Sequence, residues 1–454
     1  MRDAKLTWDR QKLDEYLAAP QSRVPGTTMA IKVPLAEQRA SIIDYLASLP
    51  GGAGSRRVPS SGKPVASLHE WRGGRRCFKT LGRFRTRRMK DKAVHRRDFA
   101  LGVPLIAAAA LTIRRVAAAV PTDPLTARPE AATRMRRDAI AFLASLSVDQ
   151  RRAASFPLSA NERTIWSNLP VAMVPRVGVR LAELSDEARR RAHALLRASS
   201  SSQGYLKMSA TMRHDQILHD TQTGGLFGTG AIVGSMGVGN FFIAAFGDPA
   251  QDMNWGWLLT GHHLGATFTV AGPRVTFMPL FLGAQPDQVE TGPYAGESVL
   301  GHEASRAREL LLSLSPKQRN AAVLSTQSFR DVVAGPGRQR SLARYEGVPA
   351  SALDDVQQFL LWALVEEYVR NADFQPAAAQ LDAISAAGLG ALHFSWRGPV
   401  DNPDAPFYYR VHGPRIIIEY AVESGNHIHT ITRDPKNDYG SDWLGLHYQE
   451  HERG

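Results

Sequence analysis

Two pairs of closely spaced histidines are the residues of this sequence best suited to chemistry. His262 and His263 are adjacent within the strand-like stretch WGWLLTGHHLGATFTV, and His427 and His429 stand two apart in NHIHT. Residues two apart on a β-strand project to the same face, so both imidazoles of the second pair can reach one metal ion. Imidazole nitrogen suits zinc, copper, iron and nickel. The sequence therefore predicts a transition-metal site with these four histidines as ligands.

Carboxylates and cations near the histidines could complete such a site. Glu419 precedes NHIHT on another strand-like stretch and Asp434 follows it, so either could be a ligand or a general base acting on metal-bound water. Arginines could orient an anionic group of a substrate. The candidate substrate-binding residues are Arg397, Arg415, Arg433 and Trp257. Further residues that could complete a metal shell are Asp438, His302, His412 and His447. In the alternative reading, the histidines face solvent or are hydrogen-bonded in the core, and the aromatic residues are core packing.

Several other kinds of site lack support. The sequence has no G-x-S-x-G, P-loop or H-E-x-x-H motif. This removes support for an α/β-hydrolase, a P-loop nucleotide-binding enzyme and a zinc metalloprotease. Cys77 is the single cysteine, so neither an intrachain disulfide nor a cysteine-based zinc or iron–sulfur site can form.

The histidines fall within a region rich in predicted strands. Stretches of β-branched and aromatic residues bounded by Gly, Pro and Asn indicate antiparallel strands. They are 240–246, 255–270, 274–281, 391–396, 407–412, 415–421 and 426–433. Helical segments flank them: FLASLSVDQRRAA at 142–154 is echoed by LLLSLSPKQRNAA at 310–322, each predicting a second helix that opens at Val148 or Pro316. A weaker relative lies at 184–192. The pattern predicts an α+β fold, with helical layers around an antiparallel sheet.

The positive charge is concentrated at the N-terminal end. The net charge is +12, but residues 1–119 hold 24 basic and 9 acidic residues, whereas residues 120–454 hold 31 and 34. The C-terminal part therefore lacks the excess of positive charge that nucleic-acid binding requires, and we expect no nucleic-acid partner. The apolar run 99–113 is shorter than the roughly 20 residues that cross a bilayer as a helix, so we expect no stable membrane span once a signal has been removed.

Residues 1–50 resemble the C-terminal half of a class I cytochrome c. The resemblance covers Leu6–Leu49 and rests on Thr7-Trp8, the loop VPGTTM at 24–29 and a closing helix with Tyr45-Leu46. It implies that Met29 would be the axial haem ligand, and that an electron-transfer role with a redox partner is an alternative function. The C-x-x-C-H motif that attaches haem c is absent, so we expect a truncated, haem-free segment.

A linker and an export signal are expected next. Residues 51–88 carry 11 basic residues against one Glu, with many Gly and Ser, which predicts a disordered basic linker. Arg96-Arg97-Asp98-Phe99-Ala100-Leu101 resembles the twin-arginine export motif, and the apolar run and Ala117–Ala119 complete a signal-like segment at 89–119. The alternative is an internal apolar helix. The signal predicts that the domain 120–454 is periplasmic or secreted.

The region from about Thr133 to His451 resembles the bacterial family DUF3500. The resemblance rests on the SLSxxQR units, FGDP at 246–249, WGWxxxGHH at 255–263, PLFLGAQP at 279–286, HFSWRGP at 393–399 and the run from Tyr408 to Gly440. It implies no activity. The residues themselves favour an exported metal-dependent enzyme, and a non-catalytic periplasmic protein that binds a small molecule or peptide is the main alternative.

Overall fold

The computed structural model describes residues 10–18, 130–222 and 230–445, and the chain divides into two units, Met1–Ala110 and Leu111–Gly454. In the first unit, the described residues form the helix α1 (Arg10–Ala18). Met29, Cys77, the signal-like segment 89–119 and His447 lie outside the described residues.

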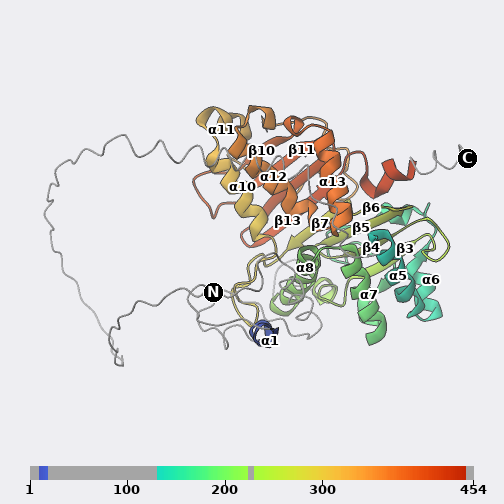
Figure 1. Cartoon of the computed structure of the whole chain (residues 1–454). Coiled ribbons are helices and arrows are strands. Elements are labelled where there is room, and N and C mark those ends of the chain that lie inside the picture. The colour runs from blue at the N-terminus through green and yellow to red at the C-terminus, as the bar shows by residue number, and fades with distance from the viewer. Residues whose placement is uncertain (1–9, 19–129, 223–229, 446–454) are drawn as a thin grey trace, which may run out of the picture. The chain divides into compact units, whose positions relative to one another are not determined.

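The second unit is built on one 13-stranded sheet, which confirms the α+β class (Figure 1). Its main strands run in the spatial order β1-β3-β4-β5-β7-β13-β12-β11-β10-β8, with β2, β6 and β9 as short additions. The first-half strands are β1 (Ser155–Phe156), β2 (Val179–Arg180), β3 (Phe242–Phe246), β4 (Asn254–Gly261), β5 (Leu264–Ala271), β6 (Arg274–Thr276) and β7 (Leu280–Ala284). The second-half strands are β8 (Val323–Ser325), β9 (Val348–Pro349), β10 (His393–Arg397), β11 (Tyr408–Gly413), β12 (Ile416–Ser424) and β13 (His427–Arg433).

Three details of the predicted sheet are wrong. The stretch 274–281 is predicted as one strand, but it is divided between β6 and β7. The stretch 255–270 was expected as one strand, but it forms the β4–β5 hairpin, and His262-His263 is its turn rather than part of a strand. The sheet is also not purely antiparallel, because the short strands β1 and β8 pair in parallel with β3 and β10. The predicted strands 407–412, 415–421 and 426–433 are confirmed as β11, β12 and β13, which pair in succession, with Pro414-Arg415 between the first two.

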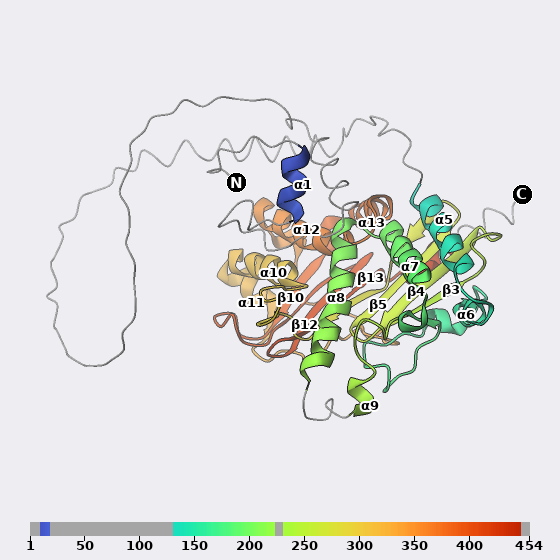
Figure 2. The same cartoon turned by 90° about the horizontal axis from the view of Figure 1, so that it is seen from below.

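Helices cover one face of the sheet (Figure 2). The α-helices of this unit are α5 (Ala131–Ala144), α6 (Val148–Ala154), α7 (Asp186–Ser199), α8 (Ser202–Thr221), α9 (Gly230–Val233), α10 (Gly301–Ser313), α11 (Pro316–Ala322), α12 (Asp355–Val369) and α13 (Phe374–Ala386). Its 3-10 turns are η1 (Asn161–Thr164), η2 (Leu181–Glu183), η4 (Ala350–Ala352), η5 (Leu389–Ala391) and η6 (Asp438–Gly440). The larger core packs between these helices and alternate strand residues such as Trp255, Trp396 and Ile418. A smaller core containing Trp166, Phe281 and Val332 lies on the opposite face, where the loops that follow β1 and β8 contribute to it.

The two halves of this unit repeat the same arrangement. Ser147 and Gln150 form a capping box at α6, and Ser315 and Gln318 form one at α11, as the SLSxxQR echo suggested. The Gln150 amide donates to Glu183 O at 2.8 Å, and the Gln318 amide donates to Ala352 O at 2.7 Å. Each half then adds a parallel strand and a short antiparallel strand to β3 or β10. The segment 184–192 is not a third copy, because it opens α7, whose counterpart in the second half is α12.

Within the described part of the chain, no helix is both long and apolar enough to cross a membrane.

Candidate metal centre

Four neighbouring strands, β4, β5, β7 and β13, bring the predicted histidines together. The β4–β5 turn supplies His262 and His263, and β13 supplies His427 and His429. β7 lies between them, because it pairs with β5 through Leu282 and with β13 through Gly283. Residues two apart on β13 share a face, as expected, so His427 and His429 point the same way.

Gly283 provides the space in which the imidazoles meet. A Cβ at this position would lie 3.0 Å from Cδ2 of His429 and 3.1 Å from Cδ2 of His263. The Gly283 N–H also donates to His263 O at 2.8 Å, which ties the turn to β7. A side chain here would therefore push the rings of two candidate ligands apart.

The backbone at His263 adopts a conformation that L-residues rarely take. Its φ of 61° lies in the left-handed region, where a non-glycine residue costs on the order of 1–2 kcal/mol. The His263 N–H donates to Asn168 O at 3.1 Å, so the loop after β1 helps to hold this turn. Such conformations persist where the surrounding structure fixes them, and they cluster at functional sites.

The Nε2 atoms of three histidines converge. Nε2 of His427 lies 2.9 Å from Nε2 of His263 and 3.0 Å from Nε2 of His429. The ligand atoms of these three residues lie close enough together to hold one metal ion. Nitrogens bound at about 2.0–2.1 Å to a tetrahedral zinc ion stand roughly 3.3 Å apart, so a small expansion of the trio would accommodate the ion.

Carboxylates contact the Nδ1 atoms of two members of the trio. Asp331 Oδ1 lies 2.9 Å from Nδ1 of His429, and Glu423 Oε2 lies 3.1 Å from Nδ1 of His427. A carboxylate that accepts the Nδ1 proton leaves Nε2 as a lone pair. With its Nδ1 proton bound to Asp331, His429 has an unprotonated Nε2 that faces Nε2 of His427.

His262 is placed differently from the other three. Its ring stacks on His263 with centroids 3.7 Å apart, and its Nδ1 lies 2.5 Å from Asp215 Oδ1 on α8. Asp215 also accepts the N–H of Gly237 at 2.7 Å, so it is held at both oxygens. Asp215, His262 and His263 form a second group with ligand atoms close together. His262 is therefore beside the trio, oriented by a buried carboxylate.

Burial favours the uncharged form of two members of the trio, His427 and His263. Burial, together with the neighbouring His429 and His262, lowers the pKa of His427 to about 3. Burial also lowers the pKa of His263 well below its ordinary value, with His262, His427 and His429 acting in the same direction. Neutral imidazole is the form that binds metal ions.

The site is close to the surface. The side chains of His427 and His429 are 14% and 6% exposed, whereas those of Glu423 and Asp331 are 39% and 42% exposed. Solvent and small molecules can therefore approach from the side of the two carboxylates.

The other predicted site residues lie in separate interactions. Glu419 accepts hydrogen bonds from Val333 N, Ala334 N and the Tyr408 hydroxyl. Asp434 pairs with Arg415 at 2.8 Å. Arg433 pairs with Asp438, and Arg397 lies over the Phe329 ring. Trp257 is buried in the core and stacks on Phe268. His412 stacks edge-on against Tyr345, and His302 lies on α10.

Only the first half of the repeat carries the histidine turn. The β4–β5 turn holds His262-His263, and the equivalent β11–β12 turn holds Pro414-Arg415. Arg415 forms an ion pair with Asp434 there. No sequence pattern pointed to the carboxylates Asp215, Asp331 and Glu423, which contact the histidines. Glu423 could have been found, because it stands four residues before His427 in the hairpin that joins β12 to β13.

Comparison with known families decides the classification. The family model described as "Protein of unknown function (DUF3500)" matches residues 128–441. The chain belongs to the DUF3500 family. The resemblance found in the sequence is thereby confirmed, and the matched residues include all four histidines of the cluster. No curated protein and no solved structure matches the chain.

Substituting Gly283 tests the packing of the DUF3500 histidine cluster. We expect Gly283→Ala to weaken metal binding and to lower the free energy of unfolding by about 1–3 kcal/mol, because the new methyl group displaces His263 and His429. Zinc titration and chemical denaturation measure the two effects. Gly390→Ala is the control, since its methyl group would meet Ser351 only at ordinary contact distance. Equal behaviour of the two variants would contradict the packing argument.

Proposed function

We propose that the DUF3500 domain binds a divalent first-row transition metal through Nε2 of His263, His427 and His429, and that this ion is the centre of a metal-dependent enzyme. The observation that carries the proposal is the convergence of three Nε2 atoms, two of which belong to rings with a carboxylate at Nδ1. Three protein ligands leave a tetrahedral ion one position for water or substrate, which is the arrangement of catalytic rather than structural zinc sites.

The chemistry that such an ion supplies is activation of bound water or polarisation of a substrate oxygen. The chain's own residues would hold and orient the ligands. Asp331 holds the Nδ1 proton of His429, Glu423 lies beside Nδ1 of His427, and Asp215 orients His262 beside the ion. Because Nδ1 of His262 is bound to Asp215, its Nε2 is free to exchange a proton with water or substrate bound to the metal.

Metal analysis of untagged protein tests the proposal. Purified without a polyhistidine tag and desalted, the protein should carry about one equivalent of a transition metal, or take up one equivalent of zinc after treatment with a chelator. Elemental analysis by mass spectrometry measures both. Less than a tenth of an equivalent, with none rebound, would mean that the ligand assignment is wrong.

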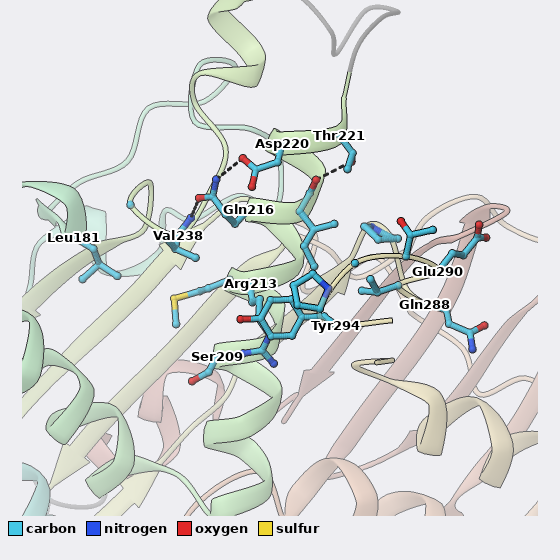
Figure 3. Close-up of a pocket in the computed structure, with 18 of the residues that line it drawn as sticks. Leu181, Ser209, Arg213, Gln216, Asp220, Thr221, Val238, Gln288, Glu290 and Tyr294 are labelled. Atoms are coloured by element: carbon cyan, nitrogen blue, oxygen red, sulfur yellow. Dashed lines mark hydrogen bonds between the residues drawn. The ribbon is translucent and has the colours of Figure 1, made fainter. Parts of the chain in front are cut away.

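A non-catalytic binding function is the second candidate, favoured by a pocket of about 980 Å³ between the α7–α8 helices and the loop 286–294 (Figure 3). Arg213 lies over the Tyr294 ring in this pocket and pairs with Glu297, while Gln216 bridges Asp220 and the Val238 N–H. Such a mixture of polar and aromatic groups suits a small molecule or a short peptide. Native mass spectrometry of secreted protein should then show an added mass that Arg213→Ala loses. Identical, ligand-free masses for both proteins would count against this candidate.

Export is also part of the proposal. We expect a chain that starts at Met89 to be exported, and Arg96→Lys/Arg97→Lys to leave it in the cytoplasm, because twin-arginine signals are recognised through the arginine pair. Cell fractionation and immunoblotting measure the distribution. Export of both proteins to the same extent would contradict a twin-arginine signal.

A further inference from the structure

The fully buried side chains of Glu419 and Arg433 form hydrogen bonds with one short stretch of backbone, residues 333–335. The Val333 N–H donates to Glu419 Oε1 at 2.9 Å, and the Ala334 N–H donates to Oε2 at 2.7 Å. From the neighbouring strand, Arg433 Nε donates to Ala334 O at 2.7 Å and Nη2 donates to Gly335 O at 3.0 Å. Glu419 and Arg433 are each 0% exposed. Together they bind both the donors and the acceptors of residues 333–335.

The two oxygens of Glu419 accept three hydrogen bonds, from the Val333 N–H, the Ala334 N–H and the Tyr408 hydroxyl. Burial raises the pKa of Glu419, and the hydrogen bonds from Tyr408, Ala334 and Val333 oppose that rise. The arrangement is therefore a charge-assisted clamp on the loop between β8 and β9.

The clamped loop also carries Asp331, whose carboxylate contacts His429 at 2.9 Å. Asp331 itself is 42% exposed, and its remaining contacts are local ones, to the Val332 N–H and to Arg338 at 3.4 Å. The position of Asp331 beside His429 is therefore set by the backbone of residues 333–335. These are the residues that Glu419 and Arg433 hold.

We propose that Glu419 and Arg433 are positioning residues for the metal site, which hold the loop 331–335 so that Asp331 keeps the Nδ1 proton of His429 and directs its Nε2 toward the ion. The inference rests on the metal-binding function proposed above. Burying two charges is costly, and an apolar core of the same volume would be about as stable, so general stability does not account for the pair. A role in fixing the loop 331–335 in one conformation accounts for the two buried charges.

A double-mutant cycle tests the coupling. Zinc affinity is measured by competition with a chromophoric chelator for the wild-type protein, Glu419→Gln, Asp331→Asn and the double variant. We expect Asp331→Asn to weaken zinc binding about 10–100-fold, as removal of an outer carboxylate does. Glu419→Gln presents an NH2 group to one loop N–H, so it should weaken binding about tenfold, and the double variant should be no weaker than Asp331→Asn alone.

Loss in the double variant equal to the product of the single losses would overturn the inference, because Glu419 would then act independently of Asp331. An unchanged zinc affinity in Glu419→Gln would also overturn the inference. Arg433→Lys, which cannot donate to both carbonyl oxygens in the same geometry, is the second variant and should behave in the same way if Glu419→Gln does not fold. Glu366→Gln is the control, since Glu366 on α12 pairs with Arg370, away from the clamp, and should leave zinc affinity unchanged.

Hydrogen exchange separates failure of this inference from failure of the proposed function. In the wild-type protein, the amides of Val333 and Ala334 should exchange slowly, and Glu419→Gln should accelerate them. Fast exchange in the wild type would exclude the clamp even if zinc binds. Absence of zinc binding by the wild type would instead refute the proposed function, and this inference with it.

Discussion

Replacing His427 with alanine is expected to reduce zinc affinity by roughly a hundredfold or more. His427 is the member of the trio that contacts both others, at 2.9 and 3.0 Å between Nε2 atoms, so its loss leaves two ligands on opposite sides of a gap. Outer carboxylates alone contribute 10–100-fold to affinity at metal sites, and a direct ligand contributes at least as much. Calorimetric titration of the metal-free protein with zinc measures the change.

His219→Ala is the matched control for this prediction. His219 lies on α8, pairs with Asp220 and is 38% exposed, so its removal should leave zinc affinity unchanged. Folding of both variants is checked by circular dichroism and thermal unfolding. Equal zinc affinity of His427→Ala and the wild-type protein would remove His427 from the ligand set.

The second large effect concerns stability rather than metal binding. Lys207 on α8 is 7% exposed, and its Nζ donates to Glu303 Oε1 at 2.7 Å and to Glu367 Oε1 at 2.8 Å. Burial raises the pKa of Glu303, which is 0% exposed, and Lys207 opposes that rise. Lys207→Ala leaves these carboxylates without their common partner, so we expect the free energy of unfolding to fall by about 3–5 kcal/mol. Chemical denaturation followed by circular dichroism measures it.

Arg152→Ala provides the comparison. Arg152 pairs with Asp149 at 2.8 Å, but the two side chains are 78% and 82% exposed, so solvent screens the interaction. This variant should change the free energy of unfolding by no more than about 1 kcal/mol. Similar changes in the two variants would show that the buried network between α8, α10 and α12 contributes no more than a surface pair.

Local patterns in the sequence predicted the parts of the site that depend on local geometry. The spacing of His427 and His429 placed both on one face of a strand, because side chains alternate along any strand. The cluster of predicted strands likewise identified the sheet. The β4–β5 turn was missed because His262-His263 has none of the Asn-Gly or Asp-Gly chemistry that marks two-residue hairpins.

Contacts distant in sequence could not be predicted in this way. Asp215 is 47 residues from His262, and Asp331 is 98 residues from His429, so no local pattern links these partners. Glu419 is a candidate base in the sequence because it lies near histidines in a strand-rich region. Its actual contacts depend on the loop between β8 and β9, whose path over the sheet is a matter of tertiary structure.

The most direct test of the metal site is a crystal structure of the zinc-loaded protein, with diffraction data collected on both sides of the zinc absorption edge. We expect one anomalous peak within about 2.0–2.1 Å of Nε2 of His263, His427 and His429. The peak should vanish below the edge, and Asp331 and Glu423 should keep their contacts with Nδ1 of His429 and His427. A zinc-loaded crystal without a peak between these three nitrogen atoms, or with its zinc bound elsewhere, would contradict the proposed metal centre.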